Sequence, residues 1–161
     1  MIYISYRGVF DGNNFEYANT PNQLGKAMAA GFSVAVDIWK EGDKFYLGNS
    51  VPETEILPTY FKGNSFWINV RNNEMQTWLQ SQPAKLYPNY YTLTYPIPEY
   101  ITASNNKLIT FGVKPINNDS VIYLPEVEDR AMFSMVNVKC FGIVSSYLTF
   151  IRRMRNEGVW Y

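Results

Sequence analysis

The first forty residues predict a β-strand, a helix and a second β-strand in direct succession. Ile2–Tyr6 is a short apolar run typical of a strand. Thr20 and Pro21 are a typical helix start, because threonine caps a helix well and proline suits its first turn, and Gly31 is expected to end this helix. Ser33–Trp39 then predicts a strand. Since a strand, a helix and a strand in this order pair in parallel through a right-handed crossover, the chain is expected to adopt an α/β fold.

Beyond residue 40 the sequence predicts more strands than helices. The expected strands are Lys44–Leu47, Phe66–Arg71, Lys85–Tyr87, Thr92–Tyr95, Lys107–Val113, Val121–Leu124 and Phe141–Ser145. Two helices are expected, one capped by Asn72 and running to about Gln82, and one over Tyr147–Arg155. Because 161 residues are enough for one domain but few for a complete eight-stranded barrel, we expect residues 1–161 to form a single domain. Its expected architecture is a reduced or incomplete TIM-like (β/α) barrel with few helices.

The absence of histidine excludes several classes of enzyme. With no histidine, the chain cannot use a histidine general acid or base, a histidine metal ligand, or a Ser-His or Cys-His pair. Cys140 is the only cysteine, so the chain forms no internal disulfide. The apolar run from Val138 to Val144 predicts that this cysteine is a core residue rather than a nucleophile.

Charge and hydropathy exclude further classes of partner. Lys and Arg together number 14, as do Asp and Glu, so a large electrostatic surface for nucleic acid is not expected. No run approaches the roughly 20 apolar residues of a membrane span, and the N-terminus lacks the basic region and cleavage site of a secretory signal. A cytoplasmic protein is therefore expected. Aromatic content is 17%, with 13 tyrosines; most of these rings are expected in the core or on strands, and the remainder could form a surface for a partner or a sugar.

Polar side chains lie at or just after the predicted carboxyl ends of the strands. They are Tyr6, Arg7, Asp37, Asn49, Asn69, Arg71 and Glu126. Of the 14 acidic residues, only Asp37 and Glu126 occupy such positions. Because the carboxyl ends of barrel strands meet at one mouth, these side chains are expected to lie together there.

A series of short motifs follows in a fixed order. The first half holds Tyr6-Arg7-Gly8, Ala18-Asn19-Thr20-Pro21, Gly31 through Asp37-Ile38-Trp39, and Tyr46-Leu47-Gly48-Asn49-Ser50-Val51-Pro52. The second half holds Trp67–Asn72, Leu124-Pro125-Glu126 and Gly142–Ser145. In order and spacing they resemble the glycerophosphodiester phosphodiesterase family of phosphatidylinositol-phospholipase-C-like barrels, and its short members in particular. The similarity is good over residues 2–72 and looser, but collinear, to about residue 148.

In that family two histidines act as general acid and base, carboxylates hold a divalent metal, and an arginine contacts the phosphate. The resemblance places the histidines at Tyr6 and Asn49, the metal-binding glutamates at Ala18 and Ala35, and the aspartate at Ser50. The chain keeps the family's residues at Arg7, Asn19 and Asp37, and it has Arg71 where the family usually has lysine. Because a divalent metal needs several oxygen ligands and two of the expected carboxylates are methyl groups, no cofactor is expected.

The resemblance and the replaced residues lead to one main hypothesis. The chain is a pseudoenzyme, a non-catalytic phosphodiesterase-like barrel that serves as a structural or interaction module with a protein partner or in an assembly. Because short relatives occur in phages and large viruses, a virion-associated or host-interaction component is an expected setting. Two alternatives are a module that binds a phosphate, polyol or sugar at the barrel mouth, and a divergent metal-dependent phosphodiesterase that uses Asp37, Glu126 and Tyr6.

The roles of single residues stay open at this point. Arg7 and Asp37 form either a buried ion pair between the first two strands or, with Arg71, part of an anion site. Glu126 is either a structural hydrogen-bond acceptor or a new catalytic acid, and Tyr6 either fills the former histidine cavity or acts as a base. The candidate ligand-binding set is Tyr6, Arg7, Asn19, Asp37, Asn49, Asn69, Arg71 and Glu126.

Overall fold

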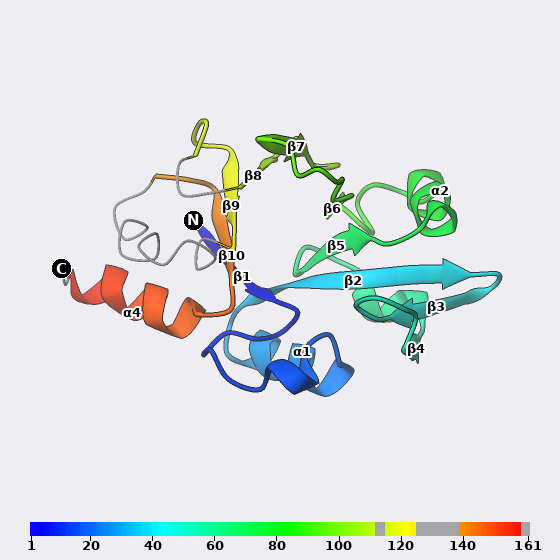
Figure 1. The fold of residues 1–161 in the computed structure, drawn as a ribbon, viewed down its shortest axis with the longest axis horizontal. Helices are drawn as coiled ribbons and strands as arrows, with labels where there is room; N and C mark the ends of the chain where they lie inside the picture. The colour runs from blue at the N-terminus through cyan, green and yellow to red at the C-terminus, as the bar shows by residue number, and fades with distance from the viewer. Residues whose placement is uncertain (112–114, 125–138, 159–161) are drawn as a thin grey trace.

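The computed structural model describes residues 1–111, 115–124 and 139–158, and its start confirms the predicted strand, helix and strand (Figure 1). β1 spans Ile2–Tyr6, α1 spans Pro21–Ala29 and β2 spans Ser33–Glu41. β1 and β2 pair in parallel, with Ile4 opposite Ser33. Thr20 caps α1 as expected, because its hydroxyl oxygen accepts a hydrogen bond from the backbone N–H of Gln23.

Among the described residues, a parallel series of strands runs through the whole molecule. Its order is β6-β5-β2-β1-β10-β9-β8. β5 spans Phe66–Val70, β6 Tyr90–Tyr91, β8 Leu108–Phe111, β9 Ser120–Tyr123 and β10 Gly142–Ser145. Antiparallel strands are added at the sides: β3 (Lys44–Leu47) pairs with β2, β4 (Thr54–Ile56) with β3, and β7 (Tyr100–Thr102) with β8. The α/β class predicted from the sequence is therefore confirmed.

The sheet curls so that one of its faces encloses an apolar cluster. The cluster takes buried residues from the whole parallel series and from the β7–β8 turn: Ile4, Ala35, Trp67, Tyr91, Ala103, Ile109, Val121, Tyr123 and Val144. Strands at opposite ends of the series can share one cluster only if the sheet is strongly curved. Ser104 in the β7–β8 turn joins these ends, because its N–H donates to the carbonyl oxygen of Tyr90 at 2.9 Å and its hydroxyl accepts from the N–H of Tyr90 at 2.8 Å.

Helices cover the opposite face of the sheet. α1 and α2 (Asn73–Ser81) bury apolar side chains against β2 and β5, and α4 (Leu148–Glu157) packs against β9 and β10. Two short helical turns, η1 (Phe15–Tyr17) and η2 (Pro58–Phe61), lie in connecting segments. Asn72 caps α2 as predicted, because its side-chain oxygen accepts a hydrogen bond from the N–H of Met75. None of the described helices has both the length and the apolar character needed to cross a membrane.

Two of the predicted strands are wrong. Lys85–Tyr87 is a turn, closed by a hydrogen bond from the N–H of Leu86 to the carbonyl oxygen of Pro83. Thr92–Tyr95 is irregular, because β6 ends at Tyr91. Aromatic residues favour strands on average, but the ring of Tyr87 instead packs across the connection onto Trp78 of α2, with 5.0 Å between ring centroids. The predicted strand Lys107–Val113 is β8 as far as Phe111, and its last two residues lie outside the described ones.

Candidate functional site

A pocket of about 490 Å³ lies where several strands of the parallel series end. Its lining residues come from the ends of β1, β5, β8 and β9 and from the β3–β4 and β6–β7 connections: Tyr6, Arg7, Asn49, Ser50, Arg71, Leu93, Tyr95, Ile97, Phe111, Tyr123 and Leu124. Parallel strands end on the same side of a sheet, so residues more than a hundred positions apart meet here. The pocket therefore brings together Tyr6, Arg7, Asn49 and Arg71 of the candidate set.

Arg7 owes its orientation to the backbone at the end of β1. Its φ of 54° lies in the left-handed region, and Gly8 follows with a φ of 83°. The N–H of Arg7 donates to the carbonyl oxygen of Ala35, and its own carbonyl oxygen accepts from the N–H of Asn19 at 2.7 Å. The chain thus turns sharply after β1. This turn directs the guanidinium toward β2, where its Nε lies 2.6 Å from Oδ2 of Asp37.

Asp37 is the buried charge of the site. It is 2% exposed, and its second oxygen, Oδ1, accepts a hydrogen bond from the Asn69 amide at 2.6 Å. Burial raises the pKa of the Asp37 carboxyl, while the Arg7 guanidinium and the Asn69 amide act against this rise. Both carboxyl oxygens have a close partner, and the carboxyl pairs with Arg7. The buried ion pair between the first two strands, one of the two roles left open for Arg7 and Asp37, is present.

Asn19 and Asn69 support this pair and do not line the pocket. The side chain of Asn19 contacts the backbone of Asp37 twice, because its amide donates to the carbonyl oxygen and its oxygen accepts from the N–H, both at 3.1 Å. The φ of 61° at Asn19 is a conformation that asparagine tolerates better than most residues. Asn69 lies directly opposite Asp37 in the β2–β5 pairing. Both asparagines therefore hold Asp37 in place for Arg7.

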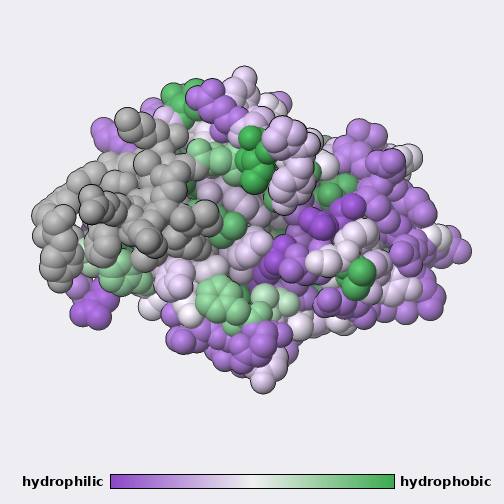
Figure 2. All heavy atoms as spheres, viewed as in Figure 1, coloured by the Kyte–Doolittle hydropathy of each residue, from purple (hydrophilic) through white to green (hydrophobic). Residues whose placement is uncertain are grey.

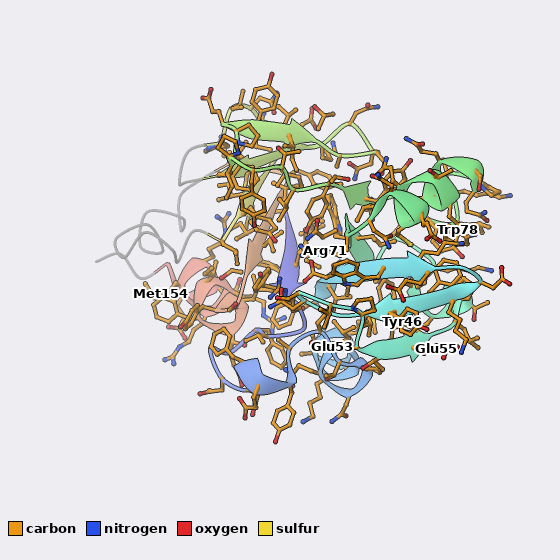
Figure 3. The ribbon with its side chains drawn as sticks, turned by 45° about the vertical axis from the view of Figure 1, so that its right-hand side comes forward. Tyr46, Glu53, Glu55, Arg71, Trp78 and Met154 are labelled. Carbon is orange, nitrogen blue, oxygen red and sulfur yellow. The ribbon has the colours of Figure 1, made fainter. Side chains whose placement is uncertain are left out.

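Arg71 follows β5 and supplies a second guanidinium (Figure 3). Its N–H donates to the carbonyl oxygen of Ile38, and its guanidinium lies over the ring of Trp39, 5.3 Å from the centroid. The Trp39 indole is itself fixed by a hydrogen bond of 2.7 Å to the carbonyl oxygen of Gly48. The Nε of Arg71 is buried, and within the described part of the chain no atom accepts a hydrogen bond from it. Arg71 is therefore held in position while its guanidinium keeps N–H donor capacity for a ligand.

Tyr6 lines the pocket, and its environment does not favour a role as a base. Its ring meets the ring of Tyr123 edge-on, with 6.0 Å between centroids, and the Arg7 guanidinium lies 4.6 Å from its own centroid. Burial raises the pKa of Tyr6 above its usual value of 10.0, and the charge of Arg7 only partly opposes this. The hydroxyl is therefore protonated at neutral pH, which favours the filler role over the role of a base.

The apolar side of the pocket contains residues that the sequence did not single out. Leu93, Tyr95 and Ile97 come from the connection after β6, and Phe111 and Tyr123 from the ends of β8 and β9. Figure 2 shows hydrophobic side chains near the middle of the molecule, whereas the part over α2 and β3 is mostly hydrophilic. The connection after β6 lacks regular periodicity, so the high aromatic content of the chain was the only signal pointing to such a surface.

The remaining family positions do not form a metal site among the described residues. Ala35 is buried in the interior cluster, whereas Ala18 and Asn49 line a second hollow of about 360 Å³ that Tyr6 and Arg7 also line. The described residues contain no group of three or more Asp, Glu or Cys side chains that could hold a metal ion. Glu126 lies outside the described residues, so its two alternative roles stay predictions.

Comparisons with protein-family models, with curated proteins and with solved structures find no match for this chain. The resemblance to the glycerophosphodiester phosphodiesterases therefore stays a prediction from the motifs.

Proposed function

We propose that this chain is a non-catalytic relative of the glycerophosphodiester phosphodiesterases whose pocket binds a small organic oxyanion. The main observation in favour of this proposal is the positive charge of the arginine side chains that line the pocket. Arg7 and Arg71 both line it, and among the described residues only Asp37 forms an ion pair with either of them. One guanidinium charge is thus balanced and the other is available to a ligand. The planar guanidinium of arginine matches phosphate and carboxylate groups, which it binds through paired N–H donors.

The arrangement of strands supports a reduced TIM-like (β/α) barrel for this proposal. The strands of the parallel series contribute to one enclosed cluster, and Ser104 links the two ends of the series. In barrels of this class, ligands bind at the carboxyl ends of the strands. The pocket lies at that end of β1, β5, β8 and β9.

Two positions support the absence of hydrolysis. Ala35 is 2% exposed and packs in the same cluster as Ile4 and Trp67, so a carboxylate at this position would be buried among apolar side chains. Tyr6 keeps its proton at neutral pH and cannot replace a histidine base. Metal-dependent hydrolysis of a glycerophosphodiester at an appreciable rate by the purified protein would contradict the non-catalytic part of the proposal.

Removal of the Arg71 charge tests the anion site. Methylphosphonate carries the oxyanion in a form that cannot be hydrolysed, and calorimetric titration is expected to show that it binds the wild-type protein. Arg71→Gln is expected to lower this affinity about 10- to 100-fold, because a hydrogen bond to a charged group is lost. Arg153→Gln is the matched control, since Arg153 lies on α4, pairs with Glu157 and does not line the pocket. Equal affinity of the wild type and Arg71→Gln, or no binding at all, would contradict the proposal.

A further inference from the structure

We infer that the oxyanion bound in this pocket carries an apolar group of about the size of an aromatic ring. The preferred ligand is then an amphiphilic phosphate or carboxylate rather than a free inorganic ion. This inference rests on the proposed anion site and adds the chemical class of its ligand. Three features of the pocket carry it: its volume, the separation of its charged and apolar sides, and the exposure of its apolar rim.

The volume of the pocket is too large for a bare oxyanion. At about 490 Å³ it falls within the range of roughly 300–1,000 Å³ that is typical of sites for organic ligands. A water molecule occupies about 30 Å³ in the liquid, and a phosphate ion corresponds to only a few such volumes. Most of the pocket would therefore stay filled with water if an inorganic anion were the ligand.

The charged and apolar lining residues come from different parts of the sheet. Arg7 and Arg71 follow β1 and β5, which flank β2 in the strand order. The apolar residues come from the ends of β8 and β9 and from the β6–β7 connection, such as Phe111 and Leu93. A ligand whose oxyanion lies between the arginines would thus direct its remaining atoms toward apolar side chains. A phosphate or polyol without an apolar group would make few favourable contacts with those apolar side chains.

The rim of the pocket exposes apolar side chains in the free protein. Tyr95 is 78% exposed and Ile97 is 51% exposed, and both line the pocket. An apolar group bound against them would remove their surface from water, which favours binding. The ring of Tyr95 adds a flat face of the kind that packs well against another aromatic ring. An aryl group matches this rim better than a flexible polar one.

A pair of phosphonates measures the contribution of the apolar group. Methylphosphonate and phenylphosphonate carry the same oxyanion and differ in the substituent. In calorimetric titrations of the whole protein, phenylphosphonate is expected to bind at least about tenfold more tightly than methylphosphonate. The double variant Tyr95→Ala/Ile97→Ala is expected to remove most of this difference in affinity between the two phosphonates.

The controls make each outcome decisive. Tyr17→Ala/Leu57→Ala removes another exposed tyrosine and another exposed aliphatic residue, neither of which lines the pocket, and this variant should still bind phenylphosphonate more tightly than methylphosphonate. Equal affinity for the two phosphonates would overturn this inference and leave the anion site standing. No binding of either phosphonate would overturn both. Binding of phenol as tight as that of phenylphosphonate would also overturn both, because the charge would then contribute nothing.

Discussion

Asp37→Ala is expected to lower the free energy of unfolding by about 3 kcal/mol. The wild-type carboxylate is buried and has one partner for each oxygen, Arg7 and Asn69. Its removal leaves a guanidinium whose side chain is only 16% exposed without a counter-charge, and it leaves the Asn69 amide without its acceptor. A buried charge that has lost its partner costs more than the intact pair contributes. Urea unfolding followed by circular dichroism measures the loss.

Two further variants separate this effect from a general effect of losing a carboxylate. Asp43→Ala removes an exposed aspartate from the β2–β3 turn and should change stability by no more than about 0.5 kcal/mol. Asp37→Ala/Arg7→Ala removes both charges, and the double-mutant cycle should show a coupling of about 1–3 kcal/mol. If Asp37→Ala lowered the free energy of unfolding no more than Asp43→Ala does, the ion pair would not stabilise the fold.

Gly8→Ala is the second substitution with a large expected effect. Gly8 has a φ of 83°, and a Cβ there would lie 2.9 Å from the backbone of Gln23 and Leu24 at the start of α1. The alanine would therefore be strained in its own backbone and would push α1 away from the end of β1. We expect a loss of about 2–4 kcal/mol in the free energy of unfolding, because both costs apply.

Gly42→Ala is the matched control for Gly8→Ala. Gly42 also has a positive φ, 59°, but a Cβ there would meet no atom within 4 Å. This variant carries the backbone strain alone and is expected to cost about 1 kcal/mol. The difference between the two variants in the free energy of unfolding measures the cost of the clash between the end of β1 and α1. A Gly8→Ala protein no less stable than Gly42→Ala would show that the close approach of α1 to Gly8 adds nothing to the cost of the substitution.

Local signals in the sequence were sufficient for two helix caps and for the pairing of the first two strands. Thr20 and Asn72 act as helix caps as predicted, because capping depends on a side chain and an N–H only a few residues away. The pairing of β1 with β2 likewise follows from the short strand–helix–strand order. Arg7 and Asp37 were expected to meet because each lies near the carboxyl end of neighbouring parallel strands, and the ion pair is present.

The apolar side of the pocket could not be predicted in the same way. Leu93 and Tyr95 lie in the segment that was wrongly predicted as a strand, and Ile97 lies in the irregular chain just after it. The β6–β7 connection meets β8 and β9 only because the sheet curls, and this curvature results from packing between distant strands. Asn19 was assigned to the candidate ligand set, yet its amide is used by the backbone of Asp37. Such roles depend on long-range contacts that no local pattern encodes.

The most direct test of the proposed anion site observes the arginine side chains themselves. The Nε–H resonances of Arg7, Arg71 and Arg153 can be followed by heteronuclear NMR while phenylphosphonate is added. The Arg71 resonance is expected to shift progressively and to saturate with the calorimetric affinity, while that of Arg153, which pairs with Glu157, stays in place. If the Arg71 resonance does not move at ligand concentrations that produce binding heat, the anion binds elsewhere and the proposed site is wrong.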